Sequence, residues 1–192
     1  MAEKTEDRRA RRSKRLLKQG LAELMQEKPF NSITVREITD RMDLNRGTFY
    51  LHYADTYELL QKLEEDTLAD VQRMIDEHCP EAGAGTLRPV FEPIVDYIVE
   101  NKAICYALFV NNSTSNFIDK VHRLIYVNGV AMIHARFTDV SDDKLAYLLS
   151  FLTFGLIGLI KQWFDTNMAL SKSAVIEIAE ELVTGATEHL LR

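Results

Sequence analysis

The segment 33–60 constrains the fold of this chain more than any other part of it. Thr34 is followed three residues later by Glu37. This spacing is typical of a capping box, in which each side chain bonds the backbone N–H of the other residue at the start of a helix. Apolar residues then recur at helical spacing. We therefore predict a helix that begins at Val35 and ends near Met42.

A second, shorter helix is expected after a tight turn. Asn45 is a residue type that caps helix N-termini, so we predict a helix over about 46–53. Gly47 in its first turn lowers helix propensity by roughly 1 kcal/mol relative to alanine. This cost suggests that the backbone there approaches another molecule closely. A long third helix is predicted over 56–78, with leucines along one side.

Two short helices joined by a tight turn form a helix-turn-helix, whose second helix enters the major groove of DNA by its N-terminal end. Arg46 is then the natural base reader, because a guanidinium can pair with both guanine acceptors. Thr48 can contact a base edge or a thymine methyl group. Tyr50, His52 and Thr34 are better placed to bind phosphates. Each of these residues alone could be structural, and it is their order in one short segment that favours DNA.

The same segment resembles the TetR family of bacterial transcriptional regulators. The match runs from about Arg15 to Leu60 and includes ITVREI, NRGTFY, HY and ELL in that order. The resemblance implies an all-α fold, with a three-helix helix-turn-helix domain at 1–54. A helical domain for ligand sensing and dimerisation would follow at 55–192. It also implies a homodimer on a palindromic operator in double-stranded DNA.

Eight residues are predicted to contact DNA on the combined evidence of pattern and resemblance. They are Thr34, Arg46, Gly47, Thr48, Tyr50, Leu51, His52 and Thr56. The chain departs from the family at Thr56, where a lysine commonly contacts phosphate. It also has Thr39 where a smaller residue is usual. Thr56 can still donate a hydrogen bond, but it carries no charge.

The distribution of charge agrees with a DNA-binding head. The whole chain has a net charge of −6. Residues 1–50, however, hold 12 basic against 8 acidic residues, and the remaining 142 hold 11 against 21. Seven of the basic residues lie between Arg8 and Lys18, at the N-terminal end of a predicted helix, where cations are disfavoured by the helix dipole. This run could be a solvated face, but contact with phosphates or the minor groove would relieve the penalty.

The remaining composition points to a cytoplasmic protein. Cys79 and Cys105 form neither a disulfide framework nor a metal motif, and we expect reduced thiols. The charged N-terminus does not resemble a secretory signal. The apolar stretch 145–160 is short for a membrane span and is interrupted by glycines, so a buried helix is expected instead.

The last two predicted helices, 142–165 and 172–191, carry the argument for a homodimer. The first is apolar nearly all round, and such a helix needs partners on every side. Two helices from each subunit would form a four-helix interface, although both could be plain core helices. The residues on which this prediction rests are Leu145, Leu148, Leu149, Leu152, Leu156, Leu159, Phe151, Phe154 and Ile157, with Ile176, Ala179, Val183, Ala186 and Leu190 on the last helix.

Aromatic residues of the C-terminal part could line a site for a small organic ligand. The candidates are Tyr97, Phe109, Tyr126, Asn128 and Trp163. Aromatic residues at helical spacing are more often ordinary core. We find no paired carboxylates, nucleophile with a base, metal cluster or phosphate loop, and expect no catalytic residue, metal or cofactor.

These observations predict a dimeric DNA-binding transcriptional regulator, a repressor that is released by a small molecule or another signal. Within the same class, the alternative is an activator or co-activator that acts through a protein partner. A protein of another class, with a head that no longer binds DNA and serves only protein interaction, would show no DNA affinity that depends on Arg46.

Overall fold

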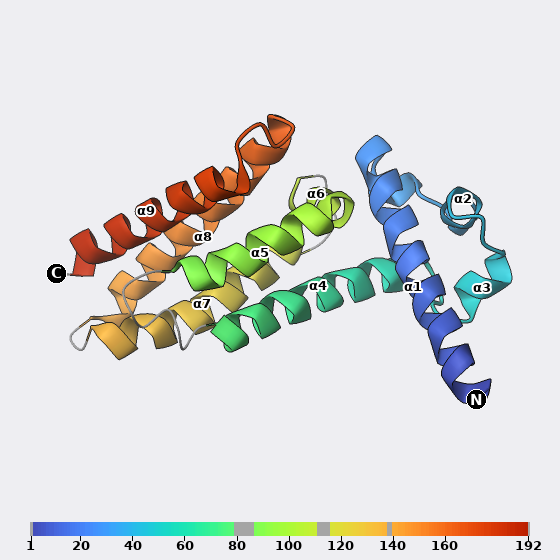
Figure 1. The fold of residues 1–192 in the computed structure, drawn as a ribbon, viewed down its shortest axis with the longest axis horizontal. Coiled ribbons are helices and arrows are strands. Elements are labelled where there is room, and N and C mark those ends of the chain that lie inside the picture. The colour runs from blue at the N-terminus through green and yellow to red at the C-terminus, as the bar shows by residue number, and fades with distance from the viewer. Residues whose placement is uncertain (1, 79–86, 111–115, 138–139, 192) are drawn as a thin grey trace. The chain divides into compact units, whose positions relative to one another are not determined.

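The computed structural model describes residues 2–78, 87–110, 116–137 and 140–191, with the side chains of 2–7 and of Arg136 left out. In this part of the chain the secondary structure is helical throughout (Figure 1). The structure forms two compact units. The first comprises residues 1–67 and 102–115, and the second comprises 68–101 and 116–192. The all-α fold expected from the sequence is therefore confirmed. The domain boundary expected after residue 54 stays a prediction.

The first unit is organised around α1 (Ala2–Glu27). Three leucines that recur at helical spacing, Leu17, Leu21 and Leu24, are at most 4% exposed and form its inward side. Gly20 lies on the same face, and a Cβ atom there would come within 2.8 Å of Cγ of Met42. The lack of a side chain at Gly20 thus lets α1 pack closely against the following helices.

The other elements of this unit are η1 (Phe30–Ser32), α2 (Val35–Arg41), α3 (Arg46–Tyr50), the first part of α4 (Thr56–His78) and α6 (Lys102–Phe109). α6 packs against α1 and brings Cys105, Ala107 and Leu108 into the core. Burial raises the pKa of the Cys105 thiol to about 12, so this cysteine stays a protonated, unreactive thiol. Cys79 lies outside the described residues.

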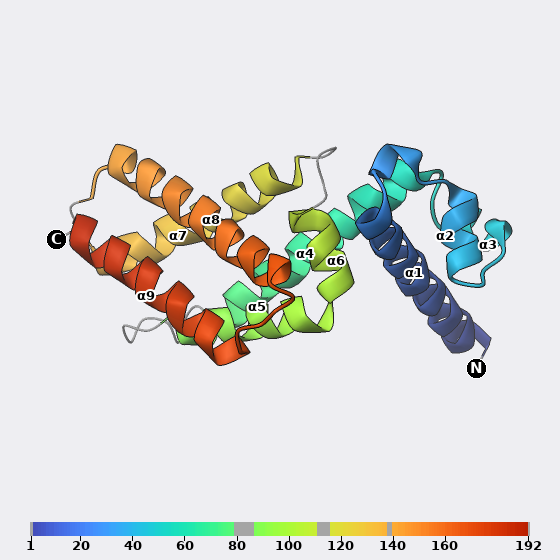
Figure 2. The same cartoon turned by 90° about the horizontal axis from the view of Figure 1, so that it is seen from above.

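The second unit contains the rest of α4 with α5 (Arg88–Glu100), α7 (Phe117–Arg136), α8 (Asp142–Asp165) and α9 (Lys172–Leu191). Figure 2 shows α8 and α9 joined by a short turn, and each helix packs on the other. α7 approaches α8 closely at Gly129, where a Cβ atom would lie 2.5 Å from Leu149. Ile133 and four leucines of α8 form the core at this end: Leu145, Leu148, Leu149 and Leu152.

α8 is long and apolar enough to cross a membrane by length and composition alone, and it is the one such helix in the described ranges. Its four core leucines are instead buried against α7 and α9 within the unit. A buried helix was the expectation from the sequence, and it is met only in part, because 28% of the apolar window of α8 is buried within the chain.

Most helix boundaries agree with the sequence predictions, but α3 is shorter than expected. It ends at Tyr50 rather than near Tyr53, because His52 and Tyr53 belong to the turn that leads into α4. α1 also begins at Ala2, ahead of the basic run. The dipole penalty proposed for that run is therefore small, since it fades beyond the first turn of a helix.

Candidate nucleic-acid interface

The first turn of α2 is closed by the capping box that the sequence predicted. The backbone N–H of Glu37 donates to the hydroxyl of Thr34 at 3.3 Å, and the N–H of Thr34 donates to the Glu37 carboxylate at 3.0 Å. The Thr34 hydroxyl also donates to the same carboxylate at 2.8 Å. Thr34 is exposed, but in this structure its hydroxyl proton is already shared with Glu37.

The turn between α2 and α3 depends on a residue in the left-handed region. Asp43 has φ of 51°, a conformation that aspartate tolerates better than most residues. The next N–H, of Leu44, donates to the carbonyl of Thr39 at 2.9 Å and closes the turn. Thr39 is fully buried, and its hydroxyl donates to the Val35 and Arg36 carbonyls. The chain therefore accommodates threonine here without an unpaired polar atom.

α3 is a helix of five residues that is capped by Asn45, and its N-terminal end is exposed to solvent. The Asn45 side chain accepts from the Gly47 N–H at 2.8 Å. Arg46 and Gly47 follow, and both are exposed. Tyr50 and Leu51 are 60% and 80% exposed, which is unusual for such large apolar surfaces. Arg46 and Tyr50, like Gly47 and Leu51, are four residues apart and so are neighbours on the helix surface. Phe49 is fully buried and anchors α3 in the core.

The remaining predicted DNA contacts are less exposed. Thr48, His52 and Thr56 are each half-buried, so only part of each side chain is accessible. The structure thus places all eight predicted residues in the first unit. Thr34 caps α2, Arg46, Gly47, Thr48 and Tyr50 are on α3, Leu51 and His52 follow it, and Thr56 begins α4. Their contact with DNA stays a prediction.

His52 is partly buried and lies near one positive charge of α1. Partial burial and, second, the charge of Lys14 on α1 lower the pKa of the His52 imidazole below its usual 6.5. His52 is therefore neutral at pH 7 in the free protein. The influence of Lys14 also shows that the basic run of α1 adjoins the end of the α3 segment, a relationship between helices that the sequence does not reveal.

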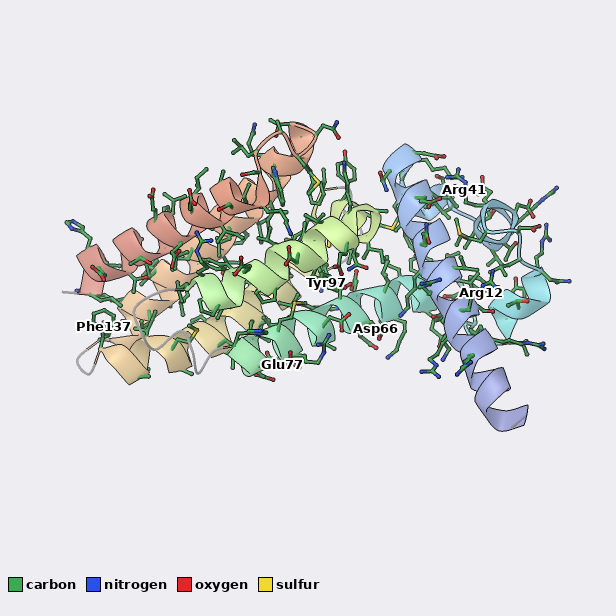
Figure 3. The ribbon with its side chains drawn as sticks, viewed as in Figure 1. Arg12, Arg41, Asp66, Glu77, Tyr97 and Phe137 are labelled. Carbon is green, nitrogen blue, oxygen red and sulfur yellow. The ribbon has the colours of Figure 1, made fainter. Side chains whose placement is uncertain are left out.

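Ion pairs fix α2 against α1. Arg41, which is labelled in Figure 3, binds both carboxylate oxygens of Glu27, at 2.9 and 2.8 Å. Lys28 donates to Glu37 at 2.6 Å, and Lys18 pairs with Asp66 of α4. The first two contacts hold α2 at both of its ends, and the third joins α1 to α4. All three engage basic residues that would otherwise be counted as free for DNA.

One exposed aromatic residue near α3 was not predicted. Tyr57 at the start of α4 is 58% exposed, packs edge-on against Phe30, and donates to the Asn31 side chain at 3.2 Å. Tyr57 follows Thr56, at the start of a helix that is predicted to approach phosphate. This position in the sequence could have identified Tyr57 as a further candidate for DNA contact.

The predicted ligand-binding residues are divided between the two units. Phe109 belongs to the first unit, while Tyr97, Tyr126, Asn128 and Trp163 belong to the second. Trp163 is 4% exposed, and its indole N–H donates to the Leu170 carbonyl.

The amide of Asn128 is fully engaged within the second unit. It exchanges two hydrogen bonds with Gln72, at 2.9 and 3.1 Å, and donates a third to the carbonyl of Leu124. A ligand role for Asn128 and the other four candidates stays a prediction.

The two last helices bury some of the residues assigned to a dimer interface and expose others. Ile176 and Ala179 are buried within the chain, and Val183 and Ala186 pack on the α8 leucines. Tyr147, Phe151 and Phe154 recur at helical spacing on α8 and are 81%, 70% and 56% exposed. Gly155 and Gly158 on this helix have open space around them, as does Gly185 on α9. On α8, the aromatic stripe Tyr147, Phe151 and Phe154 is therefore exposed, whereas Leu145, Leu148, Leu149 and Leu152 are buried.

Comparisons with known proteins agree with this architecture. Residues 19–63 match the family model described as bacterial regulatory proteins of the tetR family, and residues 85–185 match a transcriptional regulator C-terminal region. A protein of Bacillus subtilis (strain 168) described as an uncharacterized HTH-type transcriptional regulator, YxbF, is 20% identical over 171 residues. That alignment covers 88% of this chain and 44% of the relative, so the chain spans less than half of that protein.

Solved structures share the fold. A TetR transcriptional regulator from Streptococcus agalactiae 2603V superposes with a TM-score of 0.64 at 18% identity, covering 94% of this chain and 98% of the other. The dihydroxyacetone kinase operon activator DhaS superposes with a TM-score of 0.55 at 16% identity, covering 93% and 94%. The second family model spans more than half of the chain, and the first coincides with the helix-turn-helix described above. The chain therefore belongs to the TetR family of bacterial transcriptional regulators, which are DNA-binding proteins and not enzymes.

Proposed function

We propose that this protein is a cytoplasmic, dimeric repressor that reads a palindromic operator through α3 and leaves it when a signal reaches the C-terminal helices. The observation that carries the proposal is the exposed N-terminal end of α3. Arg46 and Gly47 stand free on a helix whose opposite side is held in the core by Phe49. A major groove accepts a helix end of this kind, and the guanidinium of Arg46 can bind two acceptors of one guanine.

Most of the surrounding residues fix the position of the protein on the duplex and do not read the base sequence. Tyr50, His52 and Thr56 offer hydroxyl or imidazole groups at the edges of α3 and α4, which suits phosphates. Gly47 lets the backbone approach the groove, and Thr48 and the exposed Leu51 can contact a thymine methyl group. Thr34 joins these contacts if its hydroxyl proton turns from Glu37 to a phosphate.

Dimerisation is supported by the aromatic stripe Tyr147, Phe151 and Phe154. A large apolar patch on a chain of this size is typical of a protein interface. Two copies of α8 and α9 related by a two-fold axis would bury both stripes, with the open Gly155 and Gly158 permitting close contact. A dimer also matches two half-sites on DNA about one helical turn apart.

The DNA-binding part of the proposal is tested by sequencing genomic fragments that the purified protein retains. We expect a palindromic motif for the natural sequence. Arg46→Ala should lose the preference at one base pair in each half-site, at a cost of about 1–3 kcal/mol per contact. Tyr50→Ala should weaken binding to all fragments alike. Arg123→Ala, an exposed arginine of α7, serves as the control and should change neither result.

The dimer is tested by sedimentation. Phe151→Glu should yield monomers that keep their helical content, whereas Glu181→Gln, at an exposed position of α9, should leave the dimer unchanged. A monomeric natural sequence at micromolar concentration contradicts the assigned interface.

A second candidate, activation, is favoured by one neighbour: the operon activator DhaS shares this fold. Transcription in vitro from a promoter that carries the selected fragment separates the two signs of regulation. A repressor lowers the transcript yield, and an activator raises it. In either case a ligand acts only if it binds the two DNA-binding states with different affinity.

A further inference from the structure

The outer face of α1, before the part of the chain that matches the family model, carries a set of exposed arginines. Residues 19–63 match the family model, whereas the basic run lies at 8–18. Arg8, Arg9, Arg12 and Arg15 are all exposed. Within the described residues none of the four is in a salt bridge or hydrogen bond. We call these four residues the arginine face.

The arginine face is distinct from the rest of the basic run. Lys18 is bound to Asp66, and Arg11 has an interaction of its own, so neither belongs to it. On a helix, the four arginines cluster on the side opposite Leu17 and Leu21, which are fully buried. The arginine face is therefore a positively charged surface that points to solvent, away from the apolar core.

The arrangement of these arginines is unfavourable without an external anion. Arg8 and Arg12 are four residues apart, and Arg12 and Arg15 are three apart, so they are neighbours on the helix surface. Like charges at these spacings destabilise a helix. Phosphates would remove this repulsion, and guanidinium groups bind phosphate oxygens in pairs.

The position of the face points to DNA as the source of those phosphates. Lys14 lies in the same helical segment, and its charge reaches His52, which follows α3. Lys14 therefore places a positive charge of α1 close to the end of the helix that is proposed to enter the major groove. In both views of the first unit, the N-terminal part of α1 projects beyond α2 and α3 (Figures 1 and 2). Arg12 is labelled on this segment in Figure 3.

We propose that the arginine face binds the sugar-phosphate backbone of DNA next to the base pairs that α3 reads, and so adds sequence-independent affinity. The proposal rests on the DNA-binding function argued above and extends the contact surface beyond the family-matched segment. From Arg8 to Arg15 the helix rises by roughly 10 Å, which corresponds to about three base pairs of duplex.

The test measures how DNA affinity depends on salt, because each phosphate contact contributes about 0.9 to the slope of log K against log salt concentration. The full chain is titrated with a fluorescein-labelled, mixed-sequence duplex at roughly 50–200 mM salt, so no operator needs to be known. The test variant replaces all four arginines of the face by glutamine, which keeps helix propensity close to that of arginine. The matched control makes the same charge change at four exposed residues of the second unit: Arg73, Arg123, Lys144 and Lys161.

We expect the slope of the arginine-face variant to be shallower by about 2–4, which corresponds to a loss of two to four phosphate contacts. The control should keep a slope close to that of the natural sequence. The arginine-face variant should still select the same genomic fragments, because its lost contacts carry no sequence information. Equal slopes for the two variants would overturn the inference while leaving DNA binding by α3 intact. Absence of salt-dependent DNA binding by the natural sequence would overturn the proposed function as well.

Discussion

Lys28 and Glu37 are joined across the connection from α1 to α2, with 2.6 Å between the ammonium nitrogen and a carboxylate oxygen. Together with the hydrogen bonds from Thr34, this contact lowers the pKa of the Glu37 carboxyl from 4.5 to about 2, with Lys28 as the largest cause. One carboxylate therefore both caps α2 and ties it to the end of α1.

This pKa predicts how the first unit responds to acid. Because the pKa of Glu37 is lower in the folded state, its contribution is fully present above the unfolded value of 4.5 and is lost as the pH falls toward about 2. Urea unfolding should show the natural sequence losing stability over this window, and Glu37→Gln should lose less. Glu181→Gln is the control. A Glu37→Gln curve parallel to that of the natural sequence would rule out the assigned role.

The close approach of α7 to α8 predicts that Gly129→Ala destabilises the second unit. A Cβ atom would lie 2.5 Å from a methyl carbon of Leu149, whose side chain is itself buried. Overpacking of this kind costs about 1–3 kcal/mol, which outweighs the gain of up to about 1 kcal/mol in helix propensity. Denaturant unfolding measures the difference. Val127→Ala, at an exposed site two residues earlier, should stay within about 0.5 kcal/mol. Unchanged or increased stability of Gly129→Ala would contradict the packing described here.

The starts of the helices and their inward-facing positions were largely predictable from the sequence. Capping residues such as Thr34, Asn45 and Ser141 mark helix starts through bonds within three residues, and such local chemistry is visible in the sequence itself. The inward positions of Leu17 and Leu21 follow from periodicity for the same reason.

Contacts between distant segments were not predictable in this way. Periodicity shows that Ile176 and Ala179 are on one face of α9, but it does not say whether that face meets its own chain or a second one. The structure places them inside the chain. The packing of α6 on α1 joins segments that are far apart in sequence, and no local pattern encodes such a pairing. The effect of Lys14 on His52 is of the same kind.

The hydroxyl of Tyr53 predicts a stabilising substitution. Among the side chains that the structure describes, it is the buried polar group without a hydrogen-bond partner, and burial raises the pKa of this phenol to about 12. A buried, unpaired hydroxyl costs about 1–3 kcal/mol, so Tyr53→Phe should raise the free energy of unfolding by about 1 kcal/mol. DNA affinity should not change, since the ring stays packed beside Phe49. A loss of stability on this substitution would mean that the hydroxyl has a partner in solution.

His52 predicts a dependence of DNA binding on pH. The pKa of its imidazole is lowered by burial and by Lys14, so the free protein holds it neutral at pH 7. A bound phosphate favours the imidazolium form and would raise this pKa. DNA affinity should therefore increase as the pH falls through the pKa of the free protein, and NMR titration of the ring should show a higher pKa with DNA present. Lys14→Gln should raise the pKa without DNA, and His52→Gln should abolish the pH dependence in this range.

The cap of α3 predicts a variant in which stability and DNA binding decline together. The Asn45 side chain satisfies the N–H of Gly47, and α3 extends over only five residues, from Arg46 to Tyr50, so it has few other bonds to hold its first turn. Asn45→Ala should cost about 1 kcal/mol of stability. Asn45→Asp should restore the cap, but its negative charge would lie beside the phosphates. Comparing the three proteins by thermal unfolding and by DNA titration separates these effects. Alanine should impair both properties, whereas aspartate should recover stability and still bind DNA weakly. Full DNA affinity in Asn45→Asp would show that Asn45 lies outside the nucleic-acid interface. DNA would then contact the C-terminal end of α3 rather than its N-terminal end.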